Sequence, residues 1–129
     1  MNPADRYYSN EHEWVFLDSD NMVSIGITEY AQDELGDLVF VELPAIGTIV
    51  ESMGKLGEVE SVKSVSDIFC PISGEVVHIN QEAIDSPEII NEDPYGRGWL
   101  IKLNPSNLQE IDQLMSASEY EIFLGSLGH

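Results

Sequence analysis

Short apolar segments separated by turn-forming residues recur about every ten residues from Trp14 to Leu103. This spacing is the feature that most restricts the folds open to the chain. Residues 23–27 alternate apolar with small or polar side chains, as a half-buried strand does, and follow a turn signal at 18–21. Residues 76–79 predict another strand. The pattern favours an antiparallel sandwich or barrel, so the predicted fold class is mainly β.

Two further segments predict strands of different character. Residues 38–43 are apolar at five of six positions and end before Pro44, which predicts a strand buried on both faces. The later strand, 99–103, is expected to place Trp99, Ile101 and Leu103 on one face, because side chains two positions apart point the same way.

Helices are predicted beside and after the strands. Thr28 precedes residues 29–35, and Gly36 follows them, which predicts a short helix near 28–35 with an N-cap and a glycine stop. The segments 106–109 and 116–119 read Ser-x-x-Gln and Ser-x-x-Glu, and both match a capping box. We therefore expect C-terminal helices that pack on the sheet.

The composition limits the partners of the chain. Its 129 residues include 24 acidic and only five basic side chains, which give a formal charge of −19. Such a surface disfavours nucleic acid and anionic membranes, whereas a partner with a basic face would complement it; a solubility adaptation explains the charge equally well. With 43% hydrophobic residues the chain can form one core, so residues 1–129 are predicted to be a single domain.

Neither targeting nor catalysis has a clear signal. No apolar run reaches the roughly 18 residues of a membrane span, and residues 1–5 lack a secretory pattern. This predicts a cytoplasmic and most simply bacterial protein, with a mature mitochondrial form as the alternative.

A nucleophilic enzyme would have to use Cys70 with His12, His78 or His129. Because Cys70 lies at an apolar strand end, we expect a buried packing thiol and no enzyme. No metal or nucleotide motif is present in the sequence.

Lys63 is one of only three lysines. It follows a Gly-Glu-Val string at 57–59, and the same string recurs at 74–76, so the chain is expected to fold back near Lys63. A lysine near a hairpin tip is accessible to a modifying enzyme, and its primary amine can be acylated. On the residues alone, a solvated charge and a modification site both remain open.

The sequence around Lys63 resembles the lipoyl-attachment segment of the glycine cleavage system H protein family. The similar segments are 59–67 and 71–77, and similarity continues in other blocks along almost the whole chain, at 12–15, 25–28, 31–32, 35–37, 40–44, 47, 91, 93–96 and 98–102. Lipoyl or biotinyl domains of large acyltransferases and carboxylases would instead have Asp-Lys-Ala or Met-Lys-Met at the modified lysine. The Val-Lys-Ser at 62–64 fits neither.

The resemblance implies a barrel-sandwich hybrid fold with a lipoyl-binding core at about 22–104. It also implies that Lys63 carries lipoate in amide linkage. A lipoate ligase or a lipoyl/octanoyl transferase would attach this group, and the residues expected to be recognised by that enzyme are Glu60, Ser61, Val62, Ser64 and Asp67.

The function implied by the resemblance is that of a non-catalytic, monomeric carrier. The P protein would load it with the aminomethyl group of glycine, the T protein would unload it, and the L protein would reoxidise it. An alternative is a lipoyl relay, in which the protein donates its lipoate to other enzymes. Two acids, Glu13 and Asp67, match positions of the family whose carboxylates could bond the amine of the loaded arm. That each is an ordinary surface or turn acid is an equally good interpretation. Glu11 and Glu34 depart from residues common in the family near this shelter.

Overall fold

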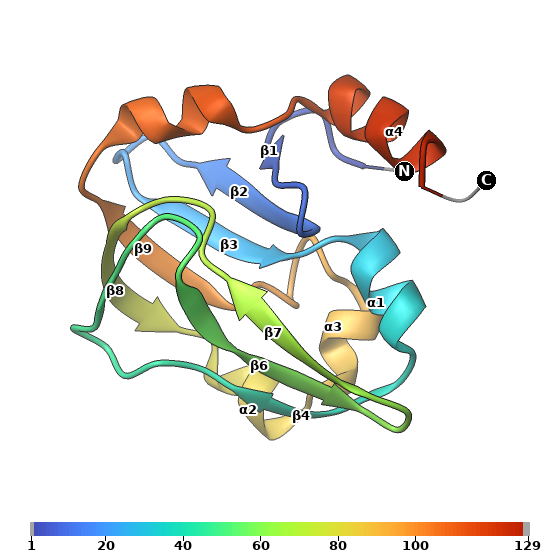
Figure 1. Ribbon diagram of the computed structural model, residues 1–129. Helices are drawn as coiled ribbons and strands as arrows, with labels where there is room; N and C mark the ends of the chain where they lie inside the picture. Colours follow the sequence, from blue (N-terminus) through green and yellow to red (C-terminus); the bar gives the residue numbers. More distant parts are fainter. Residues whose placement is uncertain (1, 128–129) are drawn as a thin grey trace.

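The alternating strands of the sequence form two antiparallel sheets. The computed structural model describes residues 2–127. One sheet has the order β1-β2-β3-β9-β8-β5 and the other β4-β6-β7, and they face each other in Figure 1. The first comprises β1 (Tyr7–Tyr8), β2 (Glu13–Leu17), β3 (Val23–Ile27), β9 (Ile101–Pro105), β8 (Gly74–Ile79) and β5 (Ile49–Val50). The second comprises β4 (Leu38–Glu42), β6 (Lys55–Ser61) and β7 (Val65–Phe69).

Apolar side chains from both sheets form one hydrophobic core. Ile25 and Leu103 from the larger sheet and Val41, Val59 and Ile68 from the smaller one are all almost completely buried in it. Removing this apolar area from water is the main stabilising contribution to the fold. The mainly β class and the strands predicted at 23–27 and 76–79 are confirmed.

The predicted burial of residues 38–43 on both faces is wrong. Strand β4 has an irregular register between Leu38, which pairs with Ser61, and Phe40, which pairs with Glu60. Such a bulge shifts the alternation of side chains by one position. As a result Val39 and Phe40 are both exposed, by 52% and 50%, whereas Leu38 and Val41 point into the core.

The strand predicted at 99–103 begins later than expected. Strand β9 starts at Ile101, and Ile101 and Leu103 share one face as predicted, where both are buried. Trp99 lies before the strand, where its carbonyl oxygen accepts a hydrogen bond from Asn80 Nδ2 at 2.6 Å. Its position on the same strand face was therefore a wrong prediction, because this bond holds residue 99 in the preceding loop.

Helix α1 (Glu29–Leu35) is confirmed with both of its ends. Thr28 Oγ1 accepts a hydrogen bond from Ala31 N at 3.2 Å. Gly36 ends the helix with φ of +85°, a conformation that side chains other than glycine rarely adopt. The short helices α2 (Gln81–Asp85) and α3 (Glu88–Glu92) lie between β8 and β9 and were not predicted.

One of the two predicted capping boxes is present. Ser116 and Glu119 form it reciprocally and begin α4 (Ala117–Gly125). The box at 106–109 is wrong. Ser106 N donates to Ser73 O at 3.0 Å, beside the last residue of β9, and Asn107 instead caps a 3₁₀ helix, η1 (Leu108–Gln113). Figure 1 shows η1 and α4 together along one side of the molecule.

Candidate functional site

Lys63 lies at the tip of the hairpin formed by β6 and β7, as the sequence predicted. The last cross-strand pair joins Glu60 and Val65. The Ser61 hydroxyl accepts hydrogen bonds from the backbone N–H groups of Lys63 at 3.2 Å and Ser64 at 3.1 Å. A further bond from Val62 N to Asp37 O, at 3.2 Å, ties the tip to the start of β4. These bonds give the turn a defined shape.

The side chain of Lys63 is exposed and lies over Gly36. A Cβ atom placed on Gly36 would be 3.4 Å from Lys63 Cε, an ordinary van der Waals contact, so the role of this glycine is to end α1. The other two lysines are engaged. Lys55 forms ion pairs with Glu58 at 2.6 Å and Asp67 at 3.4 Å, and Lys102 Nζ lies 5.4 Å from the centre of the Trp99 ring. Within residues 2–127, Lys63 takes part in no salt bridge.

The residues expected to be recognised by a modifying enzyme have different exposures. Glu60, Ser64 and Asp67 are exposed, and Val62 is 72% exposed beside the lysine. Ser61, by contrast, is only 5% exposed. Ser61 therefore acts on the turn through its hydrogen bonds, and the other four side chains are available for direct contact.

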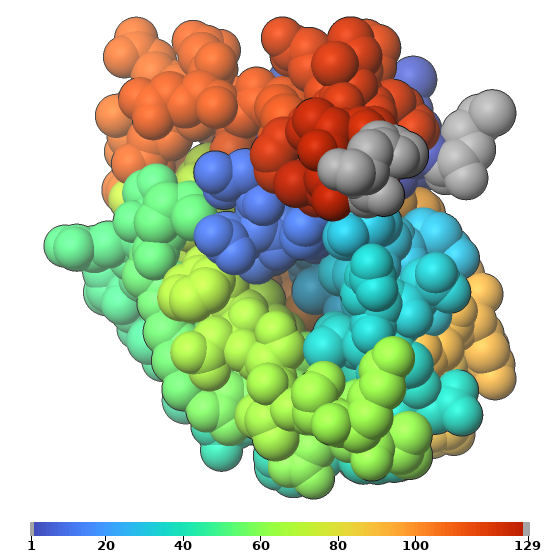
Figure 2. Space-filling model, turned by 45° about the vertical axis from the view of Figure 1, so that its right-hand side comes forward, coloured from blue at the N-terminus to red at the C-terminus, as the bar shows by residue number. Residues whose placement is uncertain are grey.

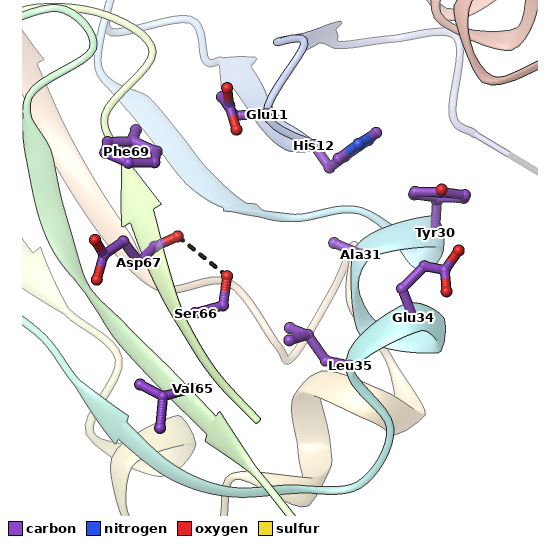
Figure 3. Close-up of a pocket in the computed structure, with 10 residues that line it drawn as sticks. All are labelled: Glu11, His12, Tyr30, Ala31, Glu34, Leu35, Val65, Ser66, Asp67 and Phe69. Atoms are coloured by element: carbon purple, nitrogen blue, oxygen red, sulfur yellow. Dashed lines mark hydrogen bonds between the residues drawn. The ribbon is translucent and has the colours of Figure 1, made fainter. Parts of the chain in front are cut away.

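A groove of about 500 Å³ runs between β7 and α1, beside the hairpin. Figure 3 shows the lining residues from the two elements facing each other, and Figure 2 shows the hollow between the cyan and yellow-green segments. The lining residues are Glu11, His12, Tyr30, Ala31, Glu34, Leu35, Val65, Ser66, Asp67 and Phe69. Val65, which follows the lysine turn, marks one end, and Glu11 and His12 lie at the other.

The groove has an acidic lining. Glu11 and Glu34 contribute carboxylates, whereas the Asp67 carboxylate points away from α1 and pairs with Lys55. Neither lysine nor arginine is among the described lining residues. His12 adds no compensating charge at neutral pH, because burial holds the pKa of its imidazole below the usual value of 6.5. A groove with this charge suits a small cationic group such as a protonated amine.

The wall at His12 is held from a distant part of the chain. The Tyr120 hydroxyl of α4 lies 2.7 Å from His12 Nδ1 and 2.8 Å from Thr28 Oγ1. The Tyr120 ring stacks on Tyr8 with a centroid separation of 4.8 Å. His12 itself has a φ of +69°, a backbone conformation uncommon for a residue with a side chain. The C-terminal helix thus positions one end of the groove.

Glu13 is close to the groove but does not line it. It is only 2% exposed, so the reading of Glu13 as an ordinary surface acid is wrong. Ser9 Oγ donates to Glu13 Oε1 at 2.6 Å, and Phe69 N donates to Oε2 at 3.2 Å. Burial raises the pKa of Glu13 to about 7, although these two hydrogen bonds oppose the shift. The carboxylate therefore joins β2 to the free edge of β7.

Cys70 is a packing residue, as predicted. It is completely buried, its Sγ lies 3.1 Å from Ile72 O, and burial raises the pKa of its thiol to about 12. Of its candidate partners, His12 is bonded to Tyr120, and His78 is exposed on β8. His129 lies outside the described residues. No nucleophile–base arrangement forms around Cys70 in the part of the chain that the structure describes.

Of the helical wall of the groove, the sequence indicated only Glu34, through the family resemblance, and Tyr30, Ala31 and Leu35 were missed. Tyr30 and Glu34, and likewise Ala31 and Leu35, are four residues apart on α1 and so share one face of the helix. That spacing was visible in the sequence. Nothing local indicated that this face would lie opposite β7.

The two sheets and the exposed hairpin lysine define the class of the protein, a small mainly β domain of the lipoyl-carrier type. Residues 6–126 match the model of the family described as glycine cleavage H-protein. The chain belongs to this family, which confirms the assignment made from the attachment segment.

Relatives from distant organisms match almost the whole chain. The glycine cleavage system H protein of Coprothermobacter proteolyticus is 54% identical over 118 residues, which cover 92% of this chain and 93% of that protein. The corresponding protein of Carboxydothermus hydrogenoformans is 50% identical over 126 residues, covering 98% and 96%. The probable H protein of Pyrococcus furiosus is 53% identical over 122 residues, covering 94% and 90%.

The fold agrees with a solved structure of the same family. The crystal structure of a glycine cleavage system H protein from Mycobacterium marinum superposes with a TM-score of 0.90 and is 43% identical. The match covers 96% of this chain and 99% of that one, and it confirms the predicted fold class. Between residues 2 and 127, none of the helices has the length and apolar character needed to cross a membrane.

Proposed function

We propose that the chain is the lipoylated carrier of the glycine cleavage system, with lipoate attached to Lys63. The observation that carries the proposal is the exposed amine of Lys63, which forms no salt bridge within residues 2–127, at the tip of a hydrogen-bonded turn next to an acidic groove. Membership of the H-protein family supports the same role. The carrier itself would not catalyse a reaction.

The residues present fit lipoate. In the attachment step, Lys63 Nζ bonds to the carbonyl carbon of an activated acyl donor, an acyl adenylate or a thioester. The Lys63 ammonium first loses one proton, so that its lone pair can attack; the bond from the carbonyl carbon to the leaving group then breaks, and Nζ loses a second proton as the neutral amide forms. When bound, lipoate supplies a reducible disulfide at the end of a long arm. Lys63 requires no rearrangement of an ion pair for this step, whereas Lys55 would have to leave Glu58 and Asp67.

The groove is suited to shelter an arm that carries an amine. Glu11 and Glu34 would attract the cationic cargo, and the apolar side chains of Leu35 and Phe69 would contact the hydrocarbon arm. The proposed contact of Asp67 with the loaded arm requires its carboxylate to leave Lys55. A contact by Glu13 stays a prediction, since its carboxylate is bonded to Ser9 and Phe69.

The implied partners are the P, T and L proteins and a lipoate ligase or lipoyl/octanoyl transferase. A tethered group can visit each active site at an effective concentration on the order of millimolar, which explains why a small carrier is useful between three enzymes. We also propose that the protein acts as a monomer in the cytoplasm. Relatives from bacteria and an archaeon, which have no mitochondria, support this location.

Lipoylation of the purified protein tests the attachment site. Incubation with lipoate ligase, ATP and lipoate should raise the intact mass by one lipoyl group, and Lys63→Arg should abolish the increase. Lys55→Arg is the matched control and should accept one group. Modification of the Lys63→Arg protein, or loss of modification in the control, would contradict the assignment.

Exchange between glycine and labelled bicarbonate, measured with P protein, tests the carrier role. Lipoylated wild-type protein should support exchange, and the unmodified protein should not. Failure of the lipoylated protein would contradict the glycine role and favour a lipoyl relay, a function that no contact in the structure specifically supports.

A further inference from the structure

The outer face of the β4–β6–β7 sheet carries an apolar row beside the lysine turn. Phe40 pairs with Glu60, and Glu60 pairs with Val65, so these three side chains stand next to one another across the sheet. Phe40 and Val65 are 50% and 59% exposed. The bulge in β4 adds Val39 to the exposed residues. Together Val39, Phe40 and Val65, with Glu60 between Phe40 and Val65, form what we term the apolar row.

Exposing the apolar side chains of this row to water is unfavourable, and the fold does not require it. A regular β4 would turn one of the two adjacent apolar residues inward, whereas the bulge turns both toward solvent. Bulges that redirect side chains are common next to functional sites. An exposed apolar cluster bordered by charged residues is typical of a surface that binds another protein.

The next row on the same face is acidic. Glu42 pairs with Glu58, and Glu58 pairs with Asp67, so three carboxylates stand side by side. Like charges directly opposite on adjacent strands destabilise a sheet. Lys55 compensates Glu58 and Asp67, but among the described residues Glu42 has no salt bridge. This acidic row is thus complementary to a basic surface.

We propose that the apolar row and the acidic row are the docking surface for the enzyme that acylates Lys63. This inference rests on the proposed function and adds a second strand, β4, to the recognised hairpin. The position of this surface beside Lys63 indicates which partner binds it. An acylating enzyme must bring its active site to Lys63 Nζ itself and so must contact the sheet beside the turn, where Val65 is two residues away. Enzymes that act on the aminomethyl cargo would bind it at the far end of the lipoyl arm.

The apolar row is tested by the kinetics of acylation. With purified lipoate ligase and the full-length unmodified protein as substrate, Phe40→Ser should lower kcat/KM about tenfold, mainly through KM, as for a residue central to an interface. Ile49→Ser is the matched control, since Ile49 is also an exposed strand residue but lies on β5 in the other sheet. It should be acylated like wild type. Coincident thermal melting curves would establish that both variants are folded.

The acidic row is tested by charge reversal. Glu42→Lys should also lower kcat/KM, and the difference from wild type should shrink as salt is added, because screening weakens the attraction. The control is Glu75→Lys, an exposed carboxylate on β8. Equal effects of the two reversals would show that only net charge matters and would overturn the role of this row.

The outcomes separate this inference from the proposed function. If the wild type is not acylated on Lys63, the proposed function fails. If the wild type is acylated and Phe40→Ser is acylated equally fast, only the docking surface is overturned. If Phe40→Ser is acylated normally but the lipoylated variant no longer supports exchange with P protein, the surface binds the decarboxylase instead, and our choice of partner is overturned.

Discussion

Replacing Glu13 with glutamine should change how the stability of the protein depends on pH. The Glu13 carboxyl is buried, and it accepts hydrogen bonds from Ser9 Oγ and Phe69 N. Burial raises its pKa from the ordinary value of 4.5 to about 7. The folded protein therefore holds a proton on this group over a pH range in which the unfolded chain has lost it.

The sign and size of the effect follow from the two pKa values. Between pH 4.5 and pH 7 the folded state binds more protons, so the free energy of unfolding falls as pH rises through this window. A shift from 4.5 to about 7 corresponds to about 3 kcal/mol in total, at roughly 1.4 kcal/mol per pH unit. Glutamine resembles the protonated acid and does not titrate. Near pH 4 the two proteins should be almost equally stable, and at pH 8 Glu13→Gln should be more stable by up to about 3 kcal/mol.

Urea unfolding, followed by tryptophan fluorescence at several pH values from 4 to 8, measures this difference. Using the difference between the two proteins removes the contribution of the other 23 acidic residues, since both proteins contain them. A difference that does not change with pH would refute the argument. So would a variant that becomes less stable than wild type as pH rises, because Glu13 would then be stabilised in its ionised form.

Two further predictions concern Cys70 and the lysine turn. Burial raises the pKa of the Cys70 thiol to about 12, so almost no thiolate is present at pH 7, and Ellman's reagent should label the protein rapidly only after unfolding in urea. Complete labelling of the folded protein within minutes would contradict its burial. Ser61→Ala should lower the free energy of unfolding by about 1 kcal/mol, because the backbone N–H groups of Lys63 and Ser64 lose their acceptor, whereas Ser64→Ala should have little effect in the same urea titration. Equal stabilities of the two serine variants would contradict the role of the Ser61 hydroxyl.

The elements that the sequence predicted well are those determined by neighbouring residues. Helix α1 is recognisable because Thr28 and Gly36 satisfy its two ends locally. The strand at 23–27 is recognisable because its alternation matches a sheet with one buried face. Lys63 was placed near a turn from the strings on either side of it, but only the family resemblance distinguished an attachment site from a solvated charge.

The parts that could not be predicted depend on contacts between distant segments. The bulge in β4 is defined by its pairing with β6, and the sequence of 38–43 alone looks continuously apolar. The groove combines residues from the loop before β2, from α1 and from β7. Its His12 wall also needs Tyr120, which is 108 residues away in the chain. Such contacts between distant segments leave no pattern in the local sequence.

The anchoring of His12 by Tyr120 has a consequence for the order in which the protein matures. The β6–β7 hairpin is built from residues 55–69 and needs only short loop closure, so it can form early during synthesis. The His12 wall cannot be completed until α4 has left the ribosome, because Tyr120 is near the end of the chain. The groove beside the lysine turn is therefore completed only when the last helix of the chain is available.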